Sequence, residues 1–165
     1  MAKKDSAPAL PRTNAMRMLD AAKIPYEVLT YEVDEDDLSG MHIAEQLAYP
    51  HEMIFKTLVA KGDKTGYMVF CIPVAKEIDL RPAAAATGNK KIEMVHVKDL
   101  LGLTGYIRGG CSPIGMKKKF PTYFDSSALN FEKITVSAGM RGAQLLLDRE
   151  RLIAFTEGKT IDVTV

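Results

Sequence analysis

The stretch from Met53 to Val74, MIFKTLVAKGDKTGYMVFCIPV, constrains the fold more than any other part of the chain. Two runs rich in β-branched and aromatic residues flank a short turn that contains Gly62, Asp63 and Gly66, a pattern typical of a β-hairpin. The first run is apolar on both of its alternating faces, which is typical of a strand buried on both sides. The chain is therefore expected to build a sheet around this hairpin.

Helical and strand patterns alternate irregularly along the rest of the chain. Because no βαβα rhythm appears, the order favours an α+β or mixed-sheet domain over a doubly wound one. Ser39 is the expected cap of the second helix, and Asp79 and Gly88 are expected at the start and end of the third. The patterns predict helices near 16–23, 41–48 and 79–88 and from about 148, and strands near 26–31, 122–127, 133–138, 143–147 and 160–165.

The chain length and charge narrow the class of protein. With 165 residues, a single domain over 13–165 is expected to build a sufficient core, preceded by a flexible tail over 1–12. The net charge is +1, so no global field draws the protein to DNA or to a membrane. Cys71 and Cys111 lie far apart and outside any metal or disulfide pattern, and no leader-like apolar run opens the chain. A cytoplasmic protein is expected.

Lys56 is the unusual residue of the hairpin. It shares a strand face with Ile54, Leu58 and Ala60, which are all apolar. An unpaired ammonium group is costly to bury, so this side chain must either reach an edge of the sheet or point into a cleft. Edge exposure is the commoner outcome, and a functional lysine is the alternative.

The segment GGCSPIGMKKKFP, residues 109–121, combines glycines, a cysteine beside a serine, and three lysines. Gly109 and Gly110 allow the backbone to approach a ligand, so their N–H groups could hold a carbonyl or phosphate oxygen. The segment matches neither a P-loop nor a nucleophile elbow. A tight turn between strands is the simpler interpretation.

Cys111 and Ser112 are candidate nucleophiles only if a base lies within hydrogen-bond reach. The three histidines are spaced by nine and forty-five residues, counted from the sequence, which fits no metal motif. We therefore expect no metal and no cofactor. Arg108, Lys117, Lys118 and Lys119 could contact phosphates, although such runs are usually solvated.

Four segments in order resemble the YbaK/EbsC family, relatives of the editing domain inserted in bacterial prolyl-tRNA synthetases. The segments are PRTNAMRMLDAAKIPYEVLTY, AEQLAYPHEMIFKTLV, GYIRGGCSPIGMKKKFPTYFDSSA and ITVSAGMRG. The resemblance covers nearly the whole chain beyond the tail. It implies an α+β domain with a mixed, barrel-like sheet flanked by helices. It also implies a free-standing deacylase that acts on the acceptor end of mischarged tRNA, most typically Cys-tRNA(Pro), with prolyl-tRNA synthetase as a further partner.

The resemblance implies roles for individual residues. Lys56 matches the functional lysine, and the N–H groups around Gly109 and Gly110 would hold the ester carbonyl. In cysteine-specific members the substrate's own thiol attacks that carbonyl, so no catalytic triad is needed. The phosphates of tRNA would meet Arg108 and Lys117–Lys119. The implied substrate-binding residues are Tyr31, Thr57, Cys111, Ser112, Pro113, Ser137 and Gln144.

The chain departs from the family pattern in two places. Cys111 replaces an aliphatic residue, which suggests packing and not nucleophilic attack, and Gln144 stands where the family often has Asp. A carboxylate that could bind the substrate's α-ammonium group is thereby missing, which bears on amino-acid specificity. The alternatives to Cys-tRNA(Pro) deacylation are action on Ala-tRNA(Pro), a thiol hydrolase that uses Cys111, and a non-catalytic nucleotide- or tRNA-binding module.

Overall fold

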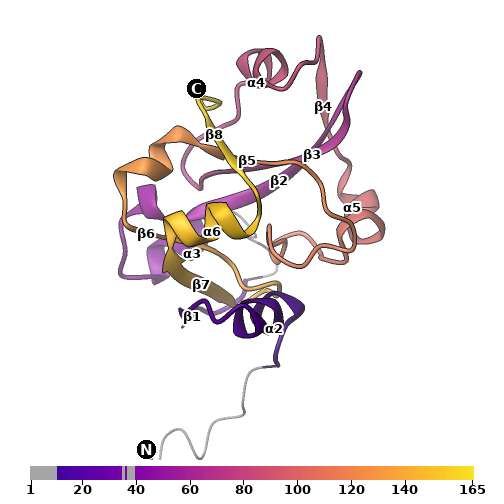
Figure 1. Ribbon diagram of the computed structural model, residues 1–165. Coiled ribbons are helices and arrows are strands. Elements are labelled where there is room, and N and C mark those ends of the chain that lie inside the picture. The colour runs from indigo at the N-terminus through magenta and orange to yellow at the C-terminus, as the bar shows by residue number, and fades with distance from the viewer. Residues whose placement is uncertain (1–10, 35, 37–39) are drawn as a thin grey trace, which may run out of the picture.

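The predicted hairpin is present in the fold. A computed structural model of the chain describes residues 11–34, 36 and 40–165. Strand β2 (Phe55–Gly62) pairs antiparallel with β3 (Gly66–Pro73) in an unbroken register. Near the turn, the ammonium of Lys61 lies 5.2 Å from the ring centroid of its register partner Tyr67. This hairpin forms the centre of the larger of two sheets (Figure 1).

The described strands divide between two sheets. The larger sheet has the order β4-β2-β3-β5-β8 and contains both antiparallel and parallel pairs, and the smaller has the antiparallel order β1-β7-β6. The remaining strands are β1 (Tyr26–Thr30), β4 (Ile92–Met94), β5 (Thr122–Asp125), β6 (Lys133–Ser137), β7 (Ala143–Asp148) and β8 (Lys159–Ile161). The mixed α+β architecture is confirmed.

Over the described residues the two sheets do not form a closed barrel. A parallel bridge from Ile54 to Thr135 joins β6 to the start of the hairpin. Beyond this point β6 pairs with β7, and β4 takes the edge of β2 only from Ala60 to Gly62. The edge of β2 between the bridge and Ala60 therefore has no strand partner within the described chain.

Most of the expected helices are present. Thr13 caps α2 by accepting from Met16 N–H, and Asp79 caps α4 as predicted, with Gly88 at a φ of 80° just beyond its end. Ser39, the expected cap of α3, lies outside the described residues. Sequence patterns missed α5 and β4. The α-helices are α2 (Asn14–Ala21), α3 (Gly40–Gln46), α4 (Leu80–Ala86), α5 (Val97–Thr104) and α6 (Arg149–Phe155), and 3₁₀ helices span His51–Met53 and Ser126–Asn130.

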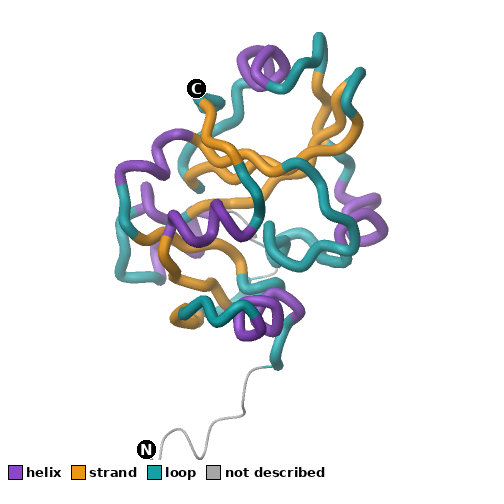
Figure 2. Tube along the Cα trace, in the orientation of Figure 1, coloured by secondary structure: helices purple, strands orange, loops and turns teal. Residues whose placement is uncertain are grey.

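The main core fills the space between the two sheets. Helix α6 crosses this space in the view of Figure 2, and its Leu152 is fully buried there. Phe55 and Val59 of β2 face the same core, whereas Ala60 belongs to a second cluster with α4. The strand is thus covered on both sides, as its apolar pattern predicts.

Both ends of the described chain contact neighbouring elements. Residues 1–10 of the predicted tail lie outside the described residues, but Arg12 forms an ion pair with Asp20 of α2. The last strand is shorter than predicted, ending at Ile161, and Thr164 makes an isolated bridge to Ile78. Within the described ranges, every helix is too short or too polar to cross a membrane.

Candidate active site

Lys56 lies on the part of β2 that lacks a second strand neighbour. It pairs with Ile72 of β3 on one side, and its side chain is 27% exposed. Its flank forms one wall of a cavity of about 410 Å³, which is within the range typical of small-ligand sites. Of the two outcomes open to this lysine, the structure places it at a cleft.

The cavity collects residues from both sheets and from two loops. Ser137 of β6 and Gln144 of β7 are register partners, which sets their side chains next to each other at one wall. The lining residues are Met41, Ile43, Phe55, Lys56, Thr57, Leu58, Val74, Glu77, Arg108, Gly109, Cys111, Ser137 and Gln144. Lys56, Thr57, Arg108, Gly109, Cys111, Ser137 and Gln144 are all residues that the sequence predicted for the site.

The loop opposite Lys56 is held in a fixed turn. Gly109 has a φ of 87°, which disfavours a side chain, and Gly110 N–H donates to Ile107 O at 2.9 Å. Arg141 Nε donates to Arg108 O at 2.8 Å and so ties this loop to the β6–β7 turn. The predicted oxyanion role of the Gly110 N–H finds no support in this geometry, because that group closes the turn.

Two other N–H groups of the loop are available. Gly109 and Cys111 both line the cavity, and their N–H groups make no hydrogen bond to any described residue. Backbone N–H groups away from water are nearly always paired in folded proteins. These donors are thus suited to hold a ligand oxygen at the wall opposite β2.

Glu77 places a carboxylate beside Lys56 at this cavity. Oε2 of Glu77 lies 3.9 Å from Lys56 Nζ. Among the described residues that line this cavity, Glu77 is the sole acidic one. Gln144 accepts from the Thr135 hydroxyl at Oε1, while its Nε2 makes no hydrogen bond within the described chain. Gln144 therefore presents a donor, not an acceptor, to a ligand.

Cys111 is not built as a nucleophile. Burial raises the pKa of its thiol to about 12, against a smaller opposing effect from the Thr104 hydrogen bond. The thiol stays neutral near pH 7, and the thiolate is the nucleophilic form. The described wall of the cavity contains no histidine. This agrees with a packing role for the side chain.

The buried thiols predict a loss of stability at alkaline pH. The folded state raises the thiol pKa values of Cys71 and Cys111 above the ordinary value of 9.0. The free energy of unfolding therefore keeps its full value below pH 9. It decreases at higher pH, because these thiols then ionise in the unfolded chain but not in the folded one. Each thiol contributes a slope of about 1.4 kcal/mol per pH unit above that value. Urea unfolding of Cys111→Ala between pH 9.5 and 10.5 should show a slope smaller by about this amount. An unchanged slope would show that Cys111 ionises normally in the fold.

The other predicted residues lie outside the Lys56 cavity. Tyr31 lines a small neighbouring hollow that also contacts Gly109. The Ser112 hydroxyl is fully buried and accepts from Ile114 N–H, so it shapes the loop and does not face the cavity. Lys117 packs its stem near Gly105.

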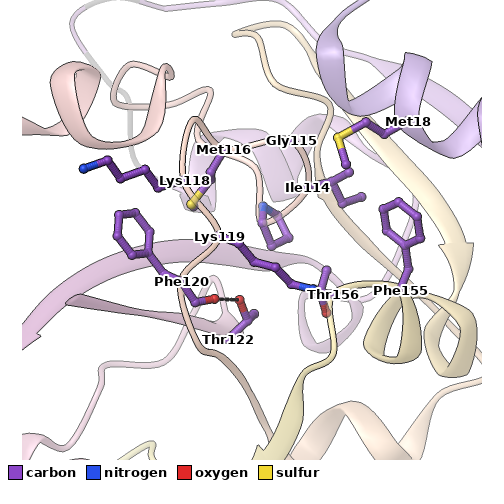
Figure 3. A pocket seen from close by; sticks show the side chains of 11 residues that line it. Met18, Ile114, Gly115, Met116, Lys118, Lys119, Phe120, Thr122, Phe155 and Thr156 are labelled. Atoms are coloured by element: carbon purple, nitrogen blue, oxygen red, sulfur yellow. Dashed lines mark hydrogen bonds between the residues drawn. The ribbon is translucent and has the colours of Figure 1, made fainter. Parts of the chain in front are cut away.

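Pro113, Lys118 and Lys119 line a second cavity of about 300 Å³ (Figure 3). Most of the predicted substrate-binding and phosphate-binding residues therefore divide between these two cavities, whereas Tyr31 lines a third hollow and Ser112 and Lys117 line neither cavity. Over the described residues, no group of three or more His, Cys, Asp or Glu side chains is arranged to hold a metal.

Two charged residues around this cavity were not predicted from the sequence. Glu77 follows the hairpin in an ordinary solvated segment, and only the fold brings it to Lys56. Arg141 lies in the segment ITVSAGMRG that carried the family resemblance, yet its bond to the backbone of residue 108 is a tertiary contact without a local pattern.

Comparison with known proteins agrees with this architecture. The sequence model of the aminoacyl-tRNA editing domain matches residues 41–155. A protein of Enterococcus faecalis (strain ATCC 700802 / V583), provisionally named Cys-tRNA(Pro)/Cys-tRNA(Cys) deacylase EbsC, is 50% identical over 153 residues, which is 93% of each chain.

Solved structures share the fold at lower identity. A crystal structure provisionally described as a trans-editing enzyme for prolyl-tRNA synthetase superposes with a TM-score of 0.79 at 21% identity, covering 95% of this chain and 99% of that one. A hypothetical protein superposes with a TM-score of 0.83 at 20% identity, over 93% and 100% of the two chains. Because the family model matches residues 41–155 and a relative is 50% identical over 93% of the chain, this chain belongs to the aminoacyl-tRNA editing domain family.

Proposed function

We propose that this protein is a trans-editing aminoacyl-tRNA deacylase that removes cysteine from Cys-tRNA(Pro) in the cytoplasm. Its family membership and the name of its 50% identical relative support the reaction class. Editing meets a physical need, because a synthetase pocket distinguishes similar apolar side chains by only about 1–3 kcal/mol per methylene.

One observation carries the proposal: Lys56 lines the same cavity as Gly109 and Cys111, whose N–H groups make no hydrogen bond within the described chain. An ester carbonyl held there develops negative charge during attack, and pre-oriented donors stabilise that charge. The described wall offers no thiolate of its own, since the pKa of the Cys111 thiol is raised to about 12, and the proposal assigns the Glu77 carboxylate to binding instead of attack. The nucleophile must come from the substrate or from water.

The cysteine substrate supplies its own nucleophile. Its sulfur attacks the ester carbonyl, forming a carbon–sulfur bond and breaking the bond to the terminal ribose oxygen. The thiol proton passes to that oxygen, which leaves as the free hydroxyl of tRNA, and the amino acid leaves as a cyclic thioester. The protein's contribution is orientation, which can lower such a barrier by roughly 7–11 kcal/mol in favourable cases.

Glu77 is the proposed partner of the substrate's α-ammonium group. It is the acidic residue of the described cavity wall, and it lies beside Lys56 at the mouth. Because its side chain is 85% exposed, the solvent-screened attraction is modest. The tRNA itself is proposed to arrive with prolyl-tRNA synthetase, since a net charge of +1 gives this chain little long-range attraction for RNA.

A substrate panel tests the function. Purified protein at substoichiometric concentration should release amino acid from Cys-tRNA(Pro) much faster than from Ala-tRNA(Pro) or Pro-tRNA(Pro). N-acetyl-Cys-tRNA(Pro) should react several-fold more slowly, because acetylation removes the charge that Glu77 would bind. Faster release from Ala-tRNA(Pro) would indicate water attack and a different specificity. Slower loss of cysteine than in buffer would identify a binding module.

A further inference from the structure

The second cavity is lined by residues of the same segment that lines the first. Gly109 and Cys111 face the Lys56 cavity, and Pro113–Met116 form a wall of the second one. Cys111 and Pro113 are two residues apart, so their Cα atoms are within about 7 Å. Adjacent parts of one segment therefore contribute to both cavities, and we take this as the reason to consider one polymeric ligand for the two.

The second cavity has aromatic sides and a cationic rim. Figure 3 shows Phe120 and Phe155 on opposite sides, with Met18 and Ile114 between α2 and the loop. These side chains come from the loop, α2 and α6, and the lining is mainly apolar. Such a surface suits a flat, apolar ring system more than a small anion or a water cluster.

The two lysines that line this cavity differ in whether a carboxylate already lies beside the amine. Lys119 Nζ lies 2.7 Å from Glu157 Oε2, so a ligand anion would have to compete with this exposed carboxylate for it. Lys118 is exposed and forms no ion pair with any described residue, and in Figure 3 its amine extends outward beyond Phe120. The rim thus offers one free cation next to the aromatic hollow.

We propose that the second cavity binds an unpaired nucleobase from the 3′ end of the tRNA, with the adjoining phosphate on Lys118. The proposal rests on the proposed function, which places the terminal aminoacyl ester in the Lys56 cavity. Bases of single-stranded RNA are held by stacking on aromatic side chains, and their phosphates by basic residues. An uncharged apolar ligand would use the hollow but not Lys118, and a free anion would use Lys118 but not the hollow.

Direct RNA binding tests the proposal without requiring turnover. The probes are an uncharged minihelix with an unpaired 3′ end and the same minihelix with a blunt end, measured by fluorescence anisotropy. Lys118→Ala and Phe155→Leu should each raise the Kd of the first probe about tenfold and leave that of the blunt probe unchanged. Lys118→Ala should also reduce the salt slope by about one. Lys98→Ala, an exposed lysine on α5, is the matched control.

Turnover separates the two proposals. For Cys-tRNA(Pro), Lys118→Ala should raise KM with little change in kcat, and it should leave the cysteinyl ester of adenosine unaffected. Equal Kd values for wild type and both variants would overturn the nucleobase site. An equal loss of affinity for the unpaired and the blunt probe would also overturn it. If wild-type protein binds the unpaired end through Lys118 but accelerates release of cysteine from neither ester, the nucleobase site is supported and the deacylase function is not.

Discussion

Replacing Lys56 by alanine is expected to lower kcat/KM for Cys-tRNA(Pro) by at least about 100-fold, the usual effect of losing one group that stabilises developing charge. Lys56 lines the cavity that is also lined by Gly109 and Cys111, whose N–H groups have no partner within the described chain. The side chain is partly exposed and its ion pair with Glu77 is long, at 3.9 Å, so the fold loses little. Single-turnover deacylation and thermal unfolding measure the two effects separately.

Two variants control this experiment. Lys56→Met keeps the apolar stem and removes the charge, so it should be as inactive as the alanine variant if the ammonium matters. Lys61→Ala removes an exposed lysine from the same strand, where the amine lies over the Tyr67 ring outside the cavity. That variant should keep its activity. A folded Lys56→Met protein with normal turnover would remove the ammonium from the mechanism.

Local patterns were sufficient to predict the hairpin and most helices. β2 and β3 are adjacent in sequence and joined by a turn with glycines, so their pairing requires only short-range chemistry. Asp79 caps α4 by a side-chain bond to a residue two positions away, and that signal is also local. α5 was missed because its cap, His96, makes no side-chain capping bond and its exposed apolar residues blur the helical period.

The site was predictable only in part, because it depends on contacts between distant segments. The apolar strand around Lys56 signalled that the lysine needs a cleft, and the glycines signalled a close-approach loop. Neither pattern reveals that the β6–β7 turn supports that loop through Arg141, or that Glu77 returns to the cavity mouth. Nor does the run of three lysines reveal that Lys119 is paired with Glu157, 38 residues away by their numbers, while Lys118 is not.

Gly110→Ala is expected to impair both activity and stability. A Cβ at this position would lie 3.0 Å from Arg141 N and 3.0 Å from Met140 C, and these backbone atoms cannot rotate away. Overpacking of this kind costs about 1–3 kcal/mol. The loop must move away from the β6–β7 turn, which displaces the N–H groups of the neighbouring residues 109 and 111. A shift of about 1 Å can reduce a rate on the order of 100-fold.

Gly102→Ala is the matched control for this substitution. Gly102 lies inside α5, and a Cβ there would meet no atom within 4 Å. Alanine favours a helix over glycine by up to about 1 kcal/mol, so this variant should be slightly more stable and fully active. Chemical unfolding and deacylation rates of the pair isolate the contact beneath the loop from the general effect of adding a methyl group. A Gly110→Ala protein with wild-type rate and stability would mean that the loop adjusts without moving its free N–H groups, and that the close packing on Arg141 does not position them.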